Sequence, residues 1–330
     1  MIDIDLKDRK ILYQLDLNCR QSNARIGKKV GLSREVVKYR INRMEDEGII
    51  KGYWTEIDSY RFGYQVFRYL IVLQNASSIT REEIMQHIAD YKNTWAVYSV
   101  KGIYDISTHI WVKSIPKFFQ FWDNFNDKYG DYFAEKVFSL YLETDIFPPS
   151  YLIVEDDYRY DRENQHSVGK SESIDFSYDD YLLLNEIVEN ARVPTIKLAE
   201  KLGCSSQKAS YQLQRLVDKG IIQSFRTGIN TSKLGYEEFY VDIWLKELSK
   251  RRKIWEYLKN NPYVSFINTT AGYSDIEIEF IIDDTDKLID IIEETSSRFP
   301  GAVRKYLYWS KKKWFKLRCL PEMTKTDFKS

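Results

Sequence analysis

Two stretches of the chain decide its fold. They are NCRQSNARIGKKVGLSREVVKYRINRMEDEGIIKGY at residues 18–53 and NARVPTIKLAEKLGCSSQKASYQLQRLVDKGIIQSF at residues 190–225. Aligned without a gap over 18–64 and 190–236, the two copies share 15 identities in 47 positions. Most other positions are like for like, such as Ile26 with Leu198. Two unrelated segments with the same composition would share only a few identities by chance. We therefore interpret the chain as a tandem duplication.

The duplication extends beyond these stretches. WAVYSVKGIYDISTHIWV (95–112) parallels SFINTTAGYSDIEIEFII (265–282) at a shift of 170, with Gly-x-x-Asp in both copies. The intervening stretch 155–173 is polar, charged and almost free of aliphatic residues, which predicts a linker. Each half is then expected to contain two smaller domains.

The first stretch has the pattern of a helix-turn-helix. Asp5 is expected to cap a helix whose apolar stripe is Leu6, Ile11, Leu12 and Leu15. Ser22 or Asn23 then begins a short helix that ends at Gly31. Ser33 caps a third helix with Val36, Val37, Ile41 and Met44 on its apolar side. The alternation in GIIKGYWTEID (48–58) predicts a strand that forms a wing or leads to the next domain.

The outward face of this third helix predicts DNA binding, because its donor-rich side chains suit base edges and phosphates in a major groove. Lys and Arg exceed acidic residues by eight to one over 20–43 and by five to one over 192–215, although the net charge of the whole chain is zero. We expect two recognition helices, around 33–47 and 205–219. The candidate DNA-binding residues are Ser33, Arg34, Glu35, Lys38, Tyr39, Asn42, Arg43, Ser205, Ser206, Gln207, Lys208, Tyr211, Gln214 and Arg215.

These motifs together resemble a known family. The string Asp-x-x-Asp-x-x-Ile-Leu, then Asn-x-Arg, Ile-Gly-Lys-Lys-Val-Gly-Leu-Ser and Arg-Ile-x-Arg-Met-Glu-x-Glu-Gly-Ile-Ile-Lys-Gly-Tyr is similar to the Lrp/AsnC (leucine-responsive, feast/famine) transcriptional regulators. The resemblance covers nearly all of 5–154 and, more weakly, 177–318. Most family members carry one such unit per chain, whereas this chain carries two.

The rest of each half predicts a β-α-β-β-α-β order, which is ferredoxin-like. In the first half we expect strands at 65–73, 95–100, 106–112 and 135–143, with helices at 80–91 and 115–130. Thr80 and Glu83 are expected to form a capping box. The second half repeats the order, with its last strand at 303–310. The family resemblance implies that this is the RAM-type (regulation of amino-acid metabolism) domain, which pairs through its sheet.

The resemblance also implies an amino-acid effector near the turn between the middle strands. The candidate effector-binding residues are Gly102, Asp105, Gly272 and Asp275. The alternative is an ordinary hairpin turn, because Gly and Asp are both common turn residues. The basic stretch from Lys311 to Arg318 either touches phosphate or protects an edge strand.

We therefore predict an α+β chain in which two winged helix-turn-helix domains alternate with two ferredoxin-like RAM-type domains. The expected boundaries are 1–60, 61–154, a linker at 155–173, 174–232 and 233–320. The two ferredoxin-like domains are expected to pair within the chain, with further self-association open.

The composition of the chain disfavours several classes of protein. Three scattered cysteines and three histidines predict no disulfide framework, zinc site or other metal site, and no cofactor motif is present. No apolar run approaches the roughly 20 residues that span a bilayer. The charged start MIDIDLKDRK resembles no signal peptide, so a cytoplasmic location is expected. His109 is expected to be structural.

The predicted function is sequence-specific binding of double-stranded DNA by a transcriptional regulator, not an enzyme. One chain would act as a pseudo-dimer with two different recognition helices, modulated by a small amino-acid-like effector. Two alternatives stay open. Siroheme decarboxylases resemble this family and also occur as fused double units, and an effector-binding module that lacks DNA binding would carry the same pattern.

Overall fold

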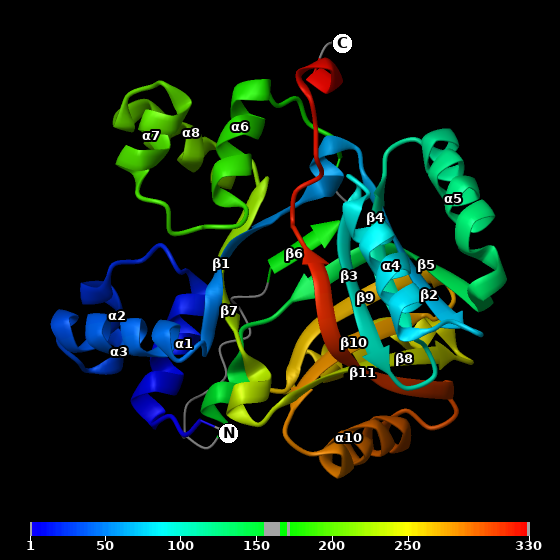
Figure 1. Ribbon diagram of the computed structural model, residues 1–330. Helices are drawn as coiled ribbons and strands as arrows, with labels where there is room; N and C mark the ends of the chain where they lie inside the picture. Colours follow the sequence, from blue (N-terminus) through cyan, green and yellow to red (C-terminus); the bar gives the residue numbers. More distant parts are fainter. Residues whose placement is uncertain (1, 155–165, 170–171, 329–330) are drawn as a thin grey trace.

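The computed structural model describes residues 2–154, 166–169 and 172–328. Each half begins with a three-helix head followed by a strand (Figure 1). Head 1 consists of α1 (Leu6–Leu17), α2 (Asn23–Val30) and α3 (Arg34–Asp46), and β1 (Ile50–Ile57) follows it. Head 2 consists of α6 (Tyr178–Ile187), α7 (Thr195–Leu202) and α8 (Ser206–Asp218), and β7 (Ile222–Ile229) follows it.

Local capping explains why these helices begin and end where they do. The Ser33 hydroxyl accepts from the backbone N–H of Val36, and Ser205 accepts from Lys208 in the same way. Gly31 and Gly203 end α2 and α7 in the left-handed conformation, at φ 70° and 63°. With their caps, α3 and α8 run from Ser33 to Glu47 and from Ser205 to Lys219, which are the bounds expected from the sequence.

Three expected details, two of packing and one of helix capping, are wrong. Leu6 and Val36 are 42% and 39% exposed and do not belong to the apolar stripes. Val36 is excluded because Val37, one residue on, already faces the core of head 1. The helix expected at 80–91 is capped by Ser77 rather than Thr80, since the Ser77 hydroxyl accepts from the N–H of Thr80.

The strands after the heads pair with each other. β1 runs antiparallel to β7, with Tyr53 opposite Thr227 and Thr55 opposite Phe225. These strands therefore link the two heads, in addition to leading each head into its next domain (Figure 1).

The ferredoxin-like units have the predicted order of elements. The first contains β2 (Gln65–Leu73), α4 (Ser78–Asp90), β3 (Thr94–Lys101), β4 (Ile106–Val112), α5 (Ile115–Tyr129) and β5 (Phe133–Ile146). The second contains β8 (Glu237–Leu245), α9 (Arg251–Leu258), β9 (Val264–Gly272), β10 (Ile276–Ile282), α10 (Thr285–Arg298) and β11 (Val303–Leu317). Short 3-10 turns connect elements at Ser59–Phe62, Gly130–Tyr132, Ser150–Ile153, Thr231–Leu234 and Leu248–Lys250, and another follows β11 at Lys325–Phe328.

The two four-stranded sheets close into one barrel. Their order is β5-β2-β4-β3 and β11-β8-β10-β9, and their edges join through β3–β11 and β5–β9. This confirms the expected pairing of the two domains within the chain. Helices α4, α5 and α10 lie on the outside of the closed sheet (Figure 1).

The barrel accounts for two departures from the expected boundaries. β11 continues seven residues beyond Ser310, because its first part pairs with β8 and its second part with β3. Its lysines therefore do not protect a free edge, and Lys311 is buried against Glu238 and Glu279. Most of the predicted linker 155–173 lies outside the described residues, but His166–Gly169 form β6, which pairs with β5.

Each head packs on a connection of the other unit. The core of head 1 includes Leu234 and Tyr236 from the start of unit two, together with Tyr151, Leu152 and Ile153. The core of head 2 includes Tyr60, Phe62 and Tyr64 of unit one, and Leu320 and Met323 beyond β11. The core of each head therefore includes residues of the other unit. Both heads lie on the same side of the barrel (Figure 1).

A charged cluster fills the space between the two sheets. Arg68 of β2 is fully buried and lies 2.8 Å from Asp242 Oδ1 and 3.0 Å from Glu277 Oε1. The hydroxyl of Tyr141 donates to Glu277 Oε2 at 2.6 Å, and Trp309 Nε1 donates to Asp242 at 3.1 Å. Burial, with the charge of Asp242 beside it, raises the pKa of Glu277 to about 7, although Arg68 and Tyr141 act in the opposite direction.

We expect Glu277→Gln to remove a pH dependence of stability. Glu277 has a higher pKa in the folded chain than its ordinary 4.5, so the folded state binds the extra proton and wild-type stability falls as pH rises from about 4.5 to about 7. Relative to wild type, the free energy of unfolding of Glu277→Gln should rise by up to about 1 kcal/mol per pH unit over this window and then level off. Urea unfolding between pH 4.5 and 8 measures this difference.

Asp242→Asn is the matched control, because it removes the other carboxylate that contacts Arg68. It should lower stability at pH 8, where Arg68 depends on its remaining partner. A constant difference between Glu277→Gln and wild type across the pH range would contradict the assignment.

Candidate nucleic-acid interface

Helix α3 presents a polar face to solvent. Val37, Ile41 and Met44 are buried against head 1, which turns the opposite side of the helix outward. Tyr39 is 68% exposed. The other exposed candidates on this helix and its cap are Ser33, Arg34, Glu35, Lys38 and Asn42.

Helix α8 presents the equivalent face of head 2. Ala209, Gln212 and Leu216 are buried, and Tyr211, the duplicate of Tyr39, is 71% exposed. Asn42 of α3 has Gln214 as its duplicate, so both helices expose an amide at the same position. Head 2 lacks a counterpart of Arg34, whose position is taken by Ser206. The remaining exposed candidates of head 2 are Ser205, Gln207 and Lys208.

Two predicted DNA-binding residues are held inside their own heads. Arg43 Nη2 lies 2.5 Å from Oδ2 of Asp8, a carboxylate that is buried in α1. Arg215 forms the same ion pair with Asp180 of α6. Although burial opposes it, hydrogen bonds from Ser177 and Gln212 lower the pKa of Asp180, with the charge of Arg215 acting in the same direction. Both arginines therefore connect the third helix of a head to its first helix.

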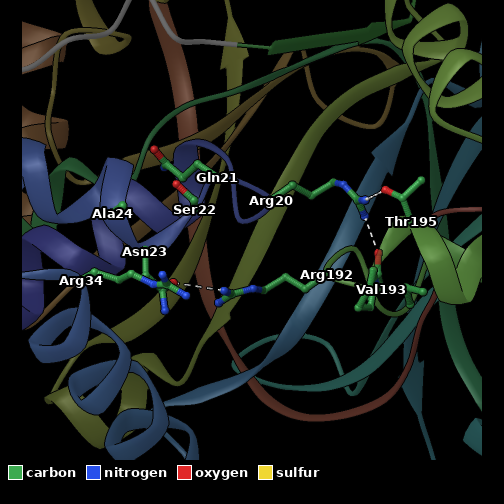
Figure 2. A pocket seen from close by; sticks show the side chains of 10 residues that line it. Arg20, Gln21, Ser22, Asn23, Ala24, Arg34, Arg192, Val193 and Thr195 are labelled. Atoms are coloured by element: carbon green, nitrogen blue, oxygen red, sulfur yellow. Dashed lines mark hydrogen bonds between the residues drawn. The ribbon is translucent and has the colours of Figure 1, made fainter. Parts of the chain in front are cut away.

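A second pair of arginines, which the sequence reasoning missed, connects head 1 to head 2. Arg20 Nη1 donates to the carbonyls of Ala191 and Val193, at 2.5 and 3.1 Å. Its duplicate Arg192 donates to Asn23 Oδ1 at 3.4 Å (Figure 2). Arg192 also donates to Tyr53 Oη at 3.2 Å, and its guanidinium lies over the Tyr53 ring. A signal was present, since both arginines are among the 15 identities of the repeat.

The predicted effector residues have structural roles in both copies. The Asp105 carboxylate accepts from the backbone N–H of Leu73 at 2.7 Å and pairs with Arg81. Asp275 accepts from the N–H of Leu245 at 2.7 Å. Gly102 follows β3 at φ 137°, and Gly272 is the last residue of β9 at φ 118°. These contacts fix the end of the first strand of each sheet against the middle hairpin, and an effector at these turns stays a prediction.

His109 is buried in the barrel, where its Nε2 lies 3.0 Å from Tyr141 Oη. Burial beside Arg68 and Lys311 keeps the pKa of His109 well below its ordinary value. Within the described part of the chain, no cluster of three His, Cys, Asp or Glu side chains is arranged to hold a metal ion. The same residues include no helix that is long and apolar enough to cross a membrane.

Comparison with known proteins supports the assignment of the heads. A family model described as winged helix-turn-helix DNA-binding matches residues 4–51 and 180–223. These two ranges contain α1 to α3 of head 1, and all of head 2 from Asp180 of α6 to the end of α8.

Single-unit regulators match parts of the chain. An uncharacterized HTH-type transcriptional regulator of Pyrococcus furiosus is 33% identical over 105 residues, which are 32% of this chain and 70% of that protein. Regulatory protein AsnC of Haemophilus influenzae is 29% identical over 118 residues, or 36% of this chain and 77% of that protein. HTH-type transcriptional regulator Ptr1 of Methanocaldococcus jannaschii is 28% identical over 137 residues, or 42% and 84%.

Among solved structures, that of the siroheme decarboxylase NirDL matches 98% of this chain and 96% of its own, with a TM-score of 0.62 and 12% sequence identity. At this identity the match concerns the fold, and it covers both heads and both ferredoxin-like units. The regulators share the sequence pattern of a single unit, and the decarboxylase shares the tandem arrangement. The chain belongs to the Lrp/AsnC family of helix-turn-helix regulators, in a tandem double-unit form.

Proposed function

We propose that this chain binds double-stranded DNA as a transcriptional regulator, with α3 and α8 as recognition helices in a pseudo-dimer. The observation that carries the proposal is the pair of duplicated helices with exposed polar faces, on heads that are held together by β1–β7 and by Arg20 and Arg192. In a helix-turn-helix protein the second helix of the motif enters the major groove, and a pair of heads reads two half-sites.

The two faces differ in chemistry, so the proposed site is asymmetric. Head 1 offers Arg34 and Lys38, which suit guanine and phosphate, whereas head 2 offers Ser206, Gln207 and Lys208. The duplicated amides Asn42 and Gln214 both suit adenine. A homodimer presents two identical heads, whereas this chain presents two different ones.

We expect DNA from upstream of the chain's own gene to bind more tightly than random DNA in fluorescence anisotropy, with affinity falling steeply between two salt concentrations. Asn42→Ala and Gln214→Ala should each reduce this preference by about 1–3 kcal/mol, the usual value of one bidentate base contact. Lys117→Ala removes an exposed charge on α5, which belongs to neither head, and should leave both affinities unchanged. If only Asn42→Ala has an effect, one head binds alone. Equal weak binding to both DNAs would contradict sequence-specific recognition by this site.

Substitution of Arg43 tests whether this residue stabilises head 1 rather than contacting DNA. We expect Arg43→Ala to lower the free energy of unfolding by roughly 1–3 kcal/mol, because buried Asp8 loses a charged partner while Arg40 remains. Arg34→Ala should leave unfolding unchanged, since Arg34 is exposed. Denaturant unfolding of both variants measures the difference, and equal stabilities would show that the ion pair with Asp8 contributes little.

A siroheme-decarboxylase-like activity is the alternative that the tandem architecture favours. Related structures include NirDL with an iron-uroporphyrin III analogue. In this chain, the space between the sheets is occupied by fully buried side chains, among them Arg68, Tyr141 and Trp309. We expect no saturable change in the absorbance spectrum of siroheme on mixing with the protein. A saturable shift at equimolar concentration would favour the enzyme.

A further inference from the structure

A cleft of about 470 Å³ lies between the two heads. The start of α2 and of α3 line it from head 1, and the segment before α7 lines it from head 2. Three guanidinium groups reach it, from Arg20, Arg34 and Arg192. Figure 2 shows Arg34 and Arg192 extending toward one another from opposite heads, with Asn23 between them.

The contacts of these arginines leave their charge uncompensated. Arg20 and Arg192 donate only to neutral groups, namely backbone carbonyls, Thr195, Asn23 and the Tyr53 hydroxyl. Within residues 2–154, 166–169 and 172–328, no carboxylate forms an ion pair with any of the three. Burial lowers the pKa of Arg20, and the Cys19 thiol beside it, rather than a carboxylate, acts in the opposite direction.

This situation differs from that of Arg40, Arg43 and Arg215. Each of these three pairs with a carboxylate of the first helix of its own head. A concave site with several cations and no counter-charge concentrates positive potential and attracts anions. Guanidinium groups match phosphate in particular, because their N–H donors form parallel pairs of hydrogen bonds with its oxygens.

We propose that the cleft between the heads is a phosphate-binding site, and that its occupant is a backbone phosphate of DNA lying between the two recognition helices. The assignment to DNA rests on the proposed function, whereas the phosphate chemistry rests on the cleft alone. Arg34 stands at the first position of α3, so a phosphate in the cleft contacts the start of this recognition helix. The site is asymmetric, because Ser206 replaces Arg34 in head 2.

The test compares Arg34→Gln and Arg192→Gln with Lys28→Gln, which removes an exposed charge from α2 outside the cleft. Inorganic pyrophosphate, titrated by calorimetry, serves as the free-phosphate probe. Random and upstream duplexes, titrated by anisotropy over a range of salt, report on DNA. Denaturant unfolding checks that Arg192→Gln stays folded, and Arg34→Gln carries the test if it does not.

We expect the cleft variants to weaken DNA binding equally on both duplexes and to reduce the slope of log affinity against log salt by about 1 each. A base contact by Arg34 would instead reduce the preference between duplexes. Pyrophosphate affinity should fall roughly tenfold in the cleft variants, the usual effect of losing a charged hydrogen bond, and change less than twofold in Lys28→Gln.

The two proposals fail in different ways. If wild type binds no DNA, but pyrophosphate binding depends on Arg34 and Arg192, the proposed function and the DNA assignment are wrong, and the cleft binds a free phosphate. If the salt slope falls without measurable pyrophosphate binding, the occupant is the DNA backbone. If the cleft variants change neither the salt slope nor pyrophosphate binding, the phosphate site is overturned.

Discussion

Closure of the two sheets into one barrel is the constraint on which the rest of the structure depends. The outer edges of β3 and β5 in the sheet of unit one are completed by β11 and β9 of unit two. This pairing leaves none of the eight barrel strands with an open edge, which avoids the association that exposed edges promote. It also determines where β1 and β7, which connect the heads to the barrel, come together, and therefore where the two heads meet. The cleft between the heads exists because the barrel holds both units in one body.

The interior of the barrel shows how the two units diverged after duplication. The strand registers place Arg68 at the position of Tyr240, Asp242 at that of Leu70, and Glu277 at that of Ser107. Unit one therefore supplies the buried arginine and unit two supplies both carboxylates. Two copies of unit two paired in this way would bury four such carboxylates without an arginine, which is costly. The charges thus favour pairing of unlike units within one chain over pairing of like units between chains.

A feature of this structure could be predicted from the sequence when its contacts join residues close together along the chain. Gly31 and Ser33 act through neighbours a few residues away, so the end of α2 and the start of α3 could be predicted from the sequence. The pairing of β1 with β7 and the continuation of β11 join segments well over 100 residues apart, and no local pattern contains that information. The same holds for the site. Exposed Lys38 and Tyr39 follow from helical periodicity, whereas Arg20 and Arg192 gain their positions only when the heads meet.

The distribution of charge differs between the barrel and the heads. The chain has 49 basic and 49 acidic residues, yet its charges are not evenly placed. Inside the barrel, three buried carboxylates, Asp242, Glu277 and Glu279, and the half-buried Glu238 form ion pairs with two cations, Arg68 and Lys311. Those negative charges are removed from solvent, while the excess cations of head 1 remain at its surface and in the cleft. The excess of cations on head 1 favours the approach of a polyanion from this side, and steering of this kind orients encounter before any base is read. A net charge of zero is thus compatible with a nucleic-acid interface.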